Sequence, residues 1–119
     1  MGRDARKGAN EAWFREVNER LEGRAAGKPS ADGTFEIVCE CAREECTERI
    51  EISFADYEEV RRSPIRFVVV IGHVDPDCEQ GVRSTTAYQV VEKFGDAGDL
   101  ARIENPRNGE EPTNGPEAD

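Results

Sequence analysis

The sequence predicts an α+β domain: a small antiparallel sheet with an N-terminal helix and a short second helix, in the order α-β-β-α-β-β, stabilised by zinc. Three observations predict this class. An amphipathic stretch comes early in the chain, short runs of β-branched and aromatic residues follow it, and three cysteines lie between the first two runs. In this chain of 119 residues, we expect residues 10–95 to fold as one domain, with disordered segments at 1–9 and 96–119.

The first predicted helix runs from Asn10, a suitable N-cap, to about Glu22. Its apolar residues recur at the helical period and share one face: Trp13, Phe14, Val17 and Leu21. Such a face usually packs on the core of its own domain. An amphipathic helix with an exposed tryptophan is also a common device for binding a partner protein. The four residues are therefore the candidate partner-binding surface, and both interpretations remain open.

The rest of the domain is predicted from short apolar runs and their boundaries. A capping box that begins at Ser53 starts a short helix over residues 54–62, which ends before Pro64. The polar segment 74–84 is expected to be a loop. Four runs predict strands, and the first two form a hairpin with the cysteines at its tip: 34–39, 47–53, 65–71 and 85–94.

Cys39, Cys41 and Cys46 form a C-x-C-x4-C pattern, and His73, the only histidine, follows the most apolar run. These four residues are candidate zinc ligands, because structural zinc takes four sulfur and nitrogen donors in a tetrahedron. The ion would supply folding free energy that so small a core lacks. Three alternatives remain open: Cys78 could replace His73 in a four-thiolate site, the cysteines could form two disulfides, or no metal binds.

Composition narrows the class of protein. The chain has 16 Lys and Arg against 26 Asp and Glu, a net charge of −10. We expect no nucleic-acid partner, because neutralising phosphates supplies most of the nonspecific affinity for nucleic acid. Nothing resembles a signal peptide, and the longest apolar run is too short to span a membrane. We therefore expect a cytoplasmic protein without a membrane partner, in a compartment that favours metal thiolates over disulfides.

The pattern of Phe35-x-x-x-Cys39-Glu40-Cys41, Cys46-Thr47-Glu48-Arg49-Ile50 and Gly72-His73 resembles that of a group of small actinobacterial zinc-binding proteins. The likeness covers residues 10–95 and includes the first predicted helix. The resemblance implies that the three cysteines of the motif and His73 belong to one site. It places no cysteine at the position of Cys78, and it brings no activity with it.

Three hypotheses of function follow. The first is a non-catalytic zinc module that binds another protein, one with a basic face given the acidic charge of the chain. The second is a redox or metal-sensing zinc-thiolate switch, with Cys78 as a possible resolving thiol. The third, a hydrolytic zinc enzyme, needs a base such as Glu40, Glu44 or Asp75. Because thiolate-rich zinc sites are mostly structural, we expect no enzyme.

Overall fold

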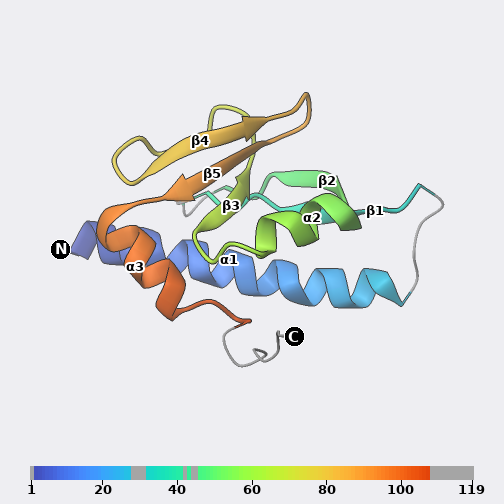
Figure 1. Ribbon diagram of the computed structural model, residues 1–119, viewed down its shortest axis with the longest axis horizontal. Coiled ribbons are helices and arrows are strands. Elements are labelled where there is room, and N and C mark those ends of the chain that lie inside the picture. Colours follow the sequence, from blue (N-terminus) through green and yellow to red (C-terminus); the bar gives the residue numbers. More distant parts are fainter. Residues whose placement is uncertain (1, 28–31, 42, 44–45, 108–119) are drawn as a thin grey trace.

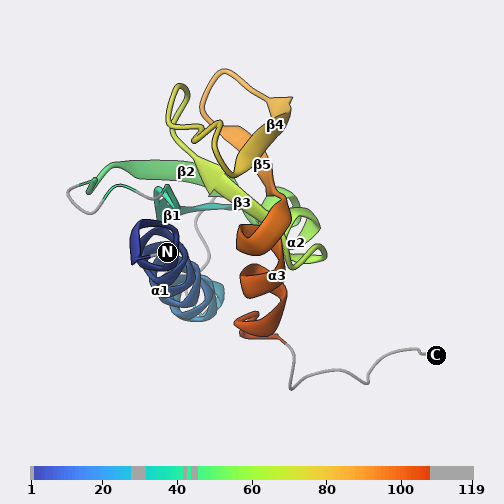
Figure 2. The ribbon, with the colours of Figure 1, turned by 90° about the vertical axis from the view of Figure 1, so that its left-hand side faces the viewer.

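The computed structural model describes residues 2–27, 32–41, 43 and 46–107, with the side chains of the first helix described from Trp13 onward. The fold is α+β, as predicted. Its strands form two antiparallel sheets, and two of its helices lie next to each other on one side of the strands (Figures 1 and 2). The elements are α1 (Gly2–Ala26), β1 (Thr34–Val38), β2 (Arg49–Ser53), α2 (Phe54–Arg61), β3 (Arg66–Val69), β4 (Glu79–Ser84), β5 (Gln89–Lys93) and α3 (Gly95–Ile103).

The predicted hairpin and the second helix are confirmed. In the β1–β2 pair, Phe35 lies opposite Ile52 and Ile37 opposite Ile50, and all four side chains are buried. The hydroxyl of Ser53 accepts a hydrogen bond from the backbone N–H of Asp56 at 3.0 Å, which caps α2. The following turn of α2 brings the ring of Tyr57 edge-on to Phe35, 5.3 Å away between centroids. The hairpin and α2 therefore share one apolar core.

Strand β4 occupies the segment that was expected to be a loop. It forms one edge of the second sheet, whose order is β3-β5-β4, and pairs with β5. Only Glu79 is buried along β4, and the register shifts between Gly81 and Arg83. The strand is held by backbone hydrogen bonds to β5 and has no apolar face of its own. No hydrophobic period marks such a strand in the sequence.

Helix α3 lies where a disordered tail was expected, so order extends past residue 95. Its glycines make it a poor helix by intrinsic propensity. Gly98 is buried, and a Cβ atom there would lie 3.1 Å from the carbonyl oxygen of Lys93. The small residue thus allows α3 to pack closely on the end of β5, a tertiary contact that propensity does not reveal. Residues 108–119 lie outside the described part of the chain.

Helix α1 is longer than predicted at both ends, and it packs on the domain through polar side chains. Arg15 and Asn18 are only 1 % and 0 % exposed, whereas Trp13 is 55 % exposed. The other three residues of the predicted apolar face, Phe14, Val17 and Leu21, are half-buried. The interpretation that this apolar face packs on the core is therefore wrong for Trp13.

None of the described helices combines the length and the apolar character needed to cross a lipid bilayer.

Arg15 joins α1 to two distant parts of the chain. Its guanidinium donates to the carbonyl oxygens of Pro64 at 2.7 Å and of Ala101, in α3, at 2.9 Å, and it lies over the ring of Phe67 at 4.8 Å. Burial, and then the nearby charge of Arg61, lower the pKa of Arg15 to about 10. The side chain is still charged at neutral pH, so α1 and α3 are held by charged hydrogen bonds to backbone carbonyls.

Arg107 fastens the chain after α3 to α1 and α2. Its guanidinium donates to Glu19 at 2.8 Å, to Glu58 at 2.8 and 3.0 Å, and to Glu22 at 3.4 Å. Three carboxyl groups thus share one cation. Burial, and then the hydrogen bond with Glu58, raise the pKa of Glu22 to about 8. Hydrogen bonds from Arg107 and then from Glu22 lower the pKa of Glu58 to about 2.

The raised pKa of Glu22 predicts a pH-dependent stability. Folded Glu22 holds its proton up to about pH 8, while the unfolded residue loses it near pH 4.5. The stability that the bound proton of Glu22 contributes is fully present below the pKa of Glu22 in the unfolded chain, and it is lost as pH rises through the pKa of Glu22 in the folded protein. Because Gln cannot ionise, Glu22→Gln should gain stability relative to wild type between about pH 6.5 and about pH 9, by on the order of 1 kcal/mol after discounting for solvent screening.

Urea unfolding at both pH values measures this difference. Glu16→Gln on the same helix is the control, because the Glu16 side chain is 51 % exposed and bonds to Arg20 alone among the described contacts. A difference between wild type and Glu22→Gln that stays constant or shrinks with rising pH would show that the Glu22 proton does not stabilise the fold.

Candidate metal centre

The first two candidate ligands leave the end of β1 on an irregular stretch of chain. The backbone N–H of Cys39 donates to the carbonyl of Glu48 at 2.9 Å, which extends the hairpin by one pair. The N–H of Glu40 then donates to the carbonyl of Val68 in β3 at 2.8 Å. The chain therefore passes from the first sheet to the second at Glu40. Successive side chains of an extended chain alternate in direction, so Cys39 and Cys41 face one side and Glu40 the other.

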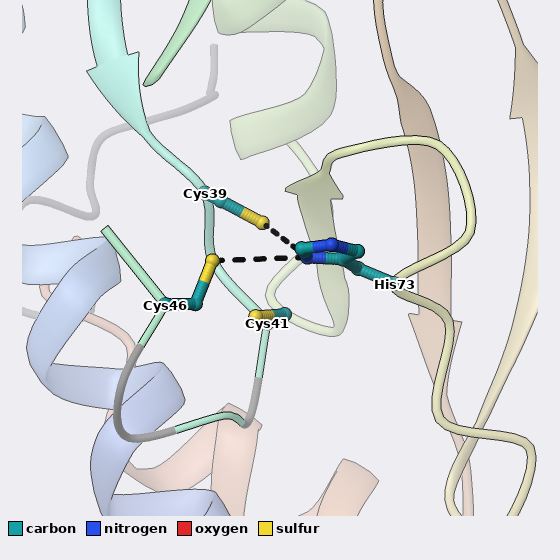
Figure 3. A group of neighbouring side chains, drawn as sticks. All are labelled: Cys39, Cys41, Cys46 and His73. Carbon is teal, nitrogen blue, oxygen red and sulfur yellow. Dashed lines mark hydrogen bonds between the residues drawn. The ribbon is translucent and has the colours of Figure 1, made fainter. Parts of the chain in front are cut away.

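His73 comes from the turn after β3. The N–H of His73 donates to the carbonyl of Val70 at 2.9 Å, which closes the turn, and Gly72 has a φ of 92°. A side chain at that left-handed angle would be strained, so the turn requires glycine. The N–H of Gly72 also donates to the side chain of Gln89 in β5 at 2.8 Å. Held in this way, the imidazole points back toward the three sulfurs (Figure 3).

The ligand atoms of Cys39, Cys41, Cys46 and His73 all lie within 4.8 Å of one another. Nδ1 of His73 is 3.6 Å from the sulfur of Cys39 and 3.7 Å from that of Cys46 (Figure 3). Zn–S bonds of about 2.3 Å and Zn–N bonds of about 2.0–2.1 Å in a tetrahedron would put sulfur and nitrogen about 3.6 Å apart. The donor set and its spacing fit a tetrahedral ion, and the four residues can hold a metal.

The thiols are shielded from water and coupled to one another. Cys39 and Cys41 are 0 % exposed and Cys46 is 8 % exposed. The hydrogen bond from Cys39 lowers the pKa of Cys41 to about 5, and the same hydrogen bond raises the pKa of Cys39. Burial raises the pKa of Cys46. Three thiols this close cannot all ionise without a cation, so the cluster favours binding a positive ion that allows all three to become thiolates.

One sulfur also receives a hydrogen bond from the main chain. The backbone N–H of Val70 donates to the sulfur of Cys39 at 3.2 Å. Such a bond stabilises negative charge on sulfur and fixes the direction of the Cβ–Sγ bond, as outer partners of metal ligands do. The turn that carries His73 therefore also orients Cys39, so the two segments of the site are bonded to each other directly.

The structure brings the four predicted ligands together and keeps Cys78 apart from them. Cys78 is half-buried just before β4, and its sulfur lies 4.0 Å from the ammonium of Lys93. It is not a member of the cluster, so the four-thiolate alternative does not form. The four cysteines form no disulfide.

Of the candidate bases for a hydrolase, Glu40 is fully buried and points away from the cluster, and Glu44 lies outside the described residues.

Sequence reasoning missed the residues that hold the site in place. The carboxylate of Glu40 accepts from Arg61 at 2.7 and 2.9 Å, from the N–H of Val68 at 2.9 Å and from Asn18 at 2.7 Å. The C-x-C spacing could have predicted that the side chain of Glu40 is buried on the side away from the ion. If both cysteines face the ion, the residue between them must face the opposite way, and a glutamate there needs a buried partner.

Comparisons with known proteins identify no relative of this chain. No protein-family model, curated protein or solved structure matches the chain. The resemblance to small actinobacterial proteins therefore stays a prediction, and the case for the metal centre rests on its geometry.

The geometry predicts which substitutions remove the metal. Cys46→Ser and His73→Ala should each weaken metal binding by more than about a hundredfold, since losing even an outer-shell partner can cost 10–100-fold. Cys78→Ser is the matched control, because it removes a thiol outside the cluster. Native mass spectrometry would report one ion per chain in the wild type and in Cys78→Ser, and its mass would identify the metal. Equal retention in all three variants would disprove the assigned ligands.

Proposed function

We propose that the chain is a non-catalytic module built on a structural zinc ion, and that it acts by binding another protein. The observation that supports this most directly is the closed donor set. Three sulfurs and one imidazole nitrogen come from the protein and converge within 4.8 Å. Four protein ligands complete a zinc tetrahedron and leave no position for water or substrate, which is the arrangement of structural sites.

The choice of zinc rests on donor chemistry. Thiolates favour soft and borderline ions, and a site of sulfurs and imidazole in a tetrahedron suits zinc rather than magnesium or calcium, which take oxygen ligands. The position of the site adds a structural reason. The ligands come from the hairpin and from the turn after β3, so one ion would tie the two sheets together. A two-stranded hairpin alone is marginally stable in water.

The interaction role is supported by the exposed side of α1. Trp13 is 55 % exposed, although it is the only tryptophan in the chain and a large apolar side chain. Arg15 and Asn18 occupy the side that packs on the domain, so the predicted face of Trp13, Phe14, Val17 and Leu21 is only partly covered. The net charge of −10 favours a partner with a basic face. Exposed tryptophan is typical of interface anchors.

An affinity-capture experiment from a lysate of the source cells tests this role. Trp13→Ala should lose a captured basic protein that the wild type retains, while the fold persists because a substitution at an exposed position usually changes stability by within about 0.5 kcal/mol. Val82→Ala is the control, since Val82 is an exposed apolar residue on β4, 38 % accessible. Equal capture by wild type and Trp13→Ala would remove the α1 face from the proposal. Capture of nothing above background would remove the interaction role.

A redox or metal-sensing switch is the second candidate, and the less complete burial of Cys46 supports it. This sulfur belongs to the least buried ligand cysteine, at 8 % against 0 % for the other two. Oxidation of a zinc-bound thiolate releases the ion. The switch predicts that about one equivalent of peroxide releases zinc within minutes, measured with a chromophoric zinc chelator. Release only at large excess of peroxide would leave the structural module as the better account.

A further inference from the structure

The metal centre and helix α1 share two anchoring side chains. Glu40 stands between the ligands Cys39 and Cys41, and its carboxylate is bonded on the side away from the sulfurs. One of its oxygens accepts from the amide of Asn18 at 2.7 Å. Asn18 belongs to α1, and its side chain is fully buried. A residue of the first helix therefore contacts the residue that separates two ligands.

Asn18 also forms hydrogen bonds with Val38, the residue on the other side of Cys39. Its amide nitrogen donates to the carbonyl of Val38 at 2.8 Å, and its amide oxygen accepts from the N–H of Val38 at 2.8 Å. Val38 is the last residue of β1. Both neighbours of Cys39 are thus bonded to one side chain of α1. A shift of the backbone at Cys39 would break these three bonds together.

The other described contacts of α1 are largely polar as well. Arg15 donates to two backbone carbonyls, and Glu19 accepts from the hydroxyl of Tyr57 at 2.7 Å and from Arg107. Trp13 is mostly exposed. Hydrogen bonds depend steeply on distance and angle, whereas apolar contacts tolerate small displacements. The docking of α1 is therefore sensitive to the position of the groups that it binds.

A bound metal ion would add to the contacts that fix those groups. Residues 39–41 belong to neither strand of the hairpin, so no sheet ladder defines their backbone beyond the bonds from Cys39 to Glu48 and from Glu40 to Val68. An ion bound by Cys39 and Cys41 would hold the stretch at both ends. Without it, the coupled thiols have no common partner, and the position of the stretch depends on those backbone bonds and on the hydrogen bonds of the Glu40 carboxylate with Arg61 and Val68.

We propose that metal occupancy and docking of α1 are thermodynamically coupled through Asn18 and Glu40: the bound ion holds α1 on the domain, and loss of the ion releases it. This inference rests on the proposed zinc site. Coupling of this kind is reciprocal, so releasing α1 must weaken metal binding by the same factor by which removing the metal weakens docking. Release would uncover Asn18, Arg15 and the buried pair of Glu40 and Arg61 for another partner.

The test compares two substitutions on α1 in the full chain. Asn18→Ala removes all three bonds to the neighbours of Cys39, and Arg20→Ala changes an exposed residue that bonds only to Glu16 among the described contacts. Zinc affinity is measured by competition with a chromophoric chelator. Hydrogen exchange of the zinc-loaded proteins reports on α1 and, separately, on β3 and β5. Asn18→Ala should speed exchange in α1, leave β3 and β5 protected, and bind zinc about 10–100-fold more weakly than Arg20→Ala.

The outcomes separate this inference from the zinc proposal. If wild type binds no zinc, the proposed function and the coupling both fail. If wild type binds zinc but Asn18→Ala either leaves α1 protected or binds zinc within about twofold of Arg20→Ala, only the coupling fails. Should Asn18→Ala not fold even with zinc, Asn18→Leu replaces it under the same criteria. That variant nearly keeps the volume of the side chain and removes the same three bonds.

Discussion

The buried carboxylate of Glu40 is the constraint on which the candidate metal centre and the joining of the two sheets depend. The side chains of Glu40 and Arg61 are 0 % and 2 % exposed. Taking both charges out of water is costly unless the geometry is good and the remaining hydrogen-bonding positions are filled. Here the carboxylate has partners from α1, α2 and β3. Removing one member of such a pair typically costs about 3–5 kcal/mol, because the other charge stays buried alone. The backbone between the two cysteines is therefore confined to the path that keeps these bonds.

The ring of Phe67 shows how a small fold can bury several charges. The cationic groups of Arg15, Lys93 and Arg61 lie 4.8, 5.4 and 5.7 Å from its centroid. Lys93 is paired with Glu79, as Arg61 is with Glu40, and Arg15 is held by carbonyl oxygens. Cations above an aromatic face gain from its negative quadrupole once they are desolvated. Each cation also comes from a different element, α1, α2 or β5. The charges thus join α1, α2 and β5 in a domain that apolar burial alone would leave marginal.

The sequence predicted those parts that depend on local patterns. The ligand set followed from three clustered thiols and a single histidine, and α2 followed from the cap at Ser53. What it could not predict depends on partners far along the chain. β4 is a polar edge strand that needs β5, and the glycine at position 98 of α3 is explained only by the close carbonyl of Lys93. The buried side of α1 was misjudged because Arg15 and Asn18 look like surface residues, and their acceptors lie on β1, on the segment before β3 and on α3. Long-range polar bonds leave no period in the sequence.

The polar packing of one side of α1 and the exposure of Trp13 have a single cause. A helix that docks through Arg15 and Asn18 must place its apolar residues elsewhere, and Trp13 is mostly exposed as a result. An apolar docking face would have buried Trp13 and left both neighbours of Cys39 without a partner in α1. The polar interface instead gives the helix directional bonds to both neighbours of Cys39. Because these bonds are short and few, their strength depends on how rigidly the backbone on both sides of Cys39 is held. The same arrangement would therefore leave an apolar surface for the proposed partner and make the position of the helix responsive to the proposed metal ion.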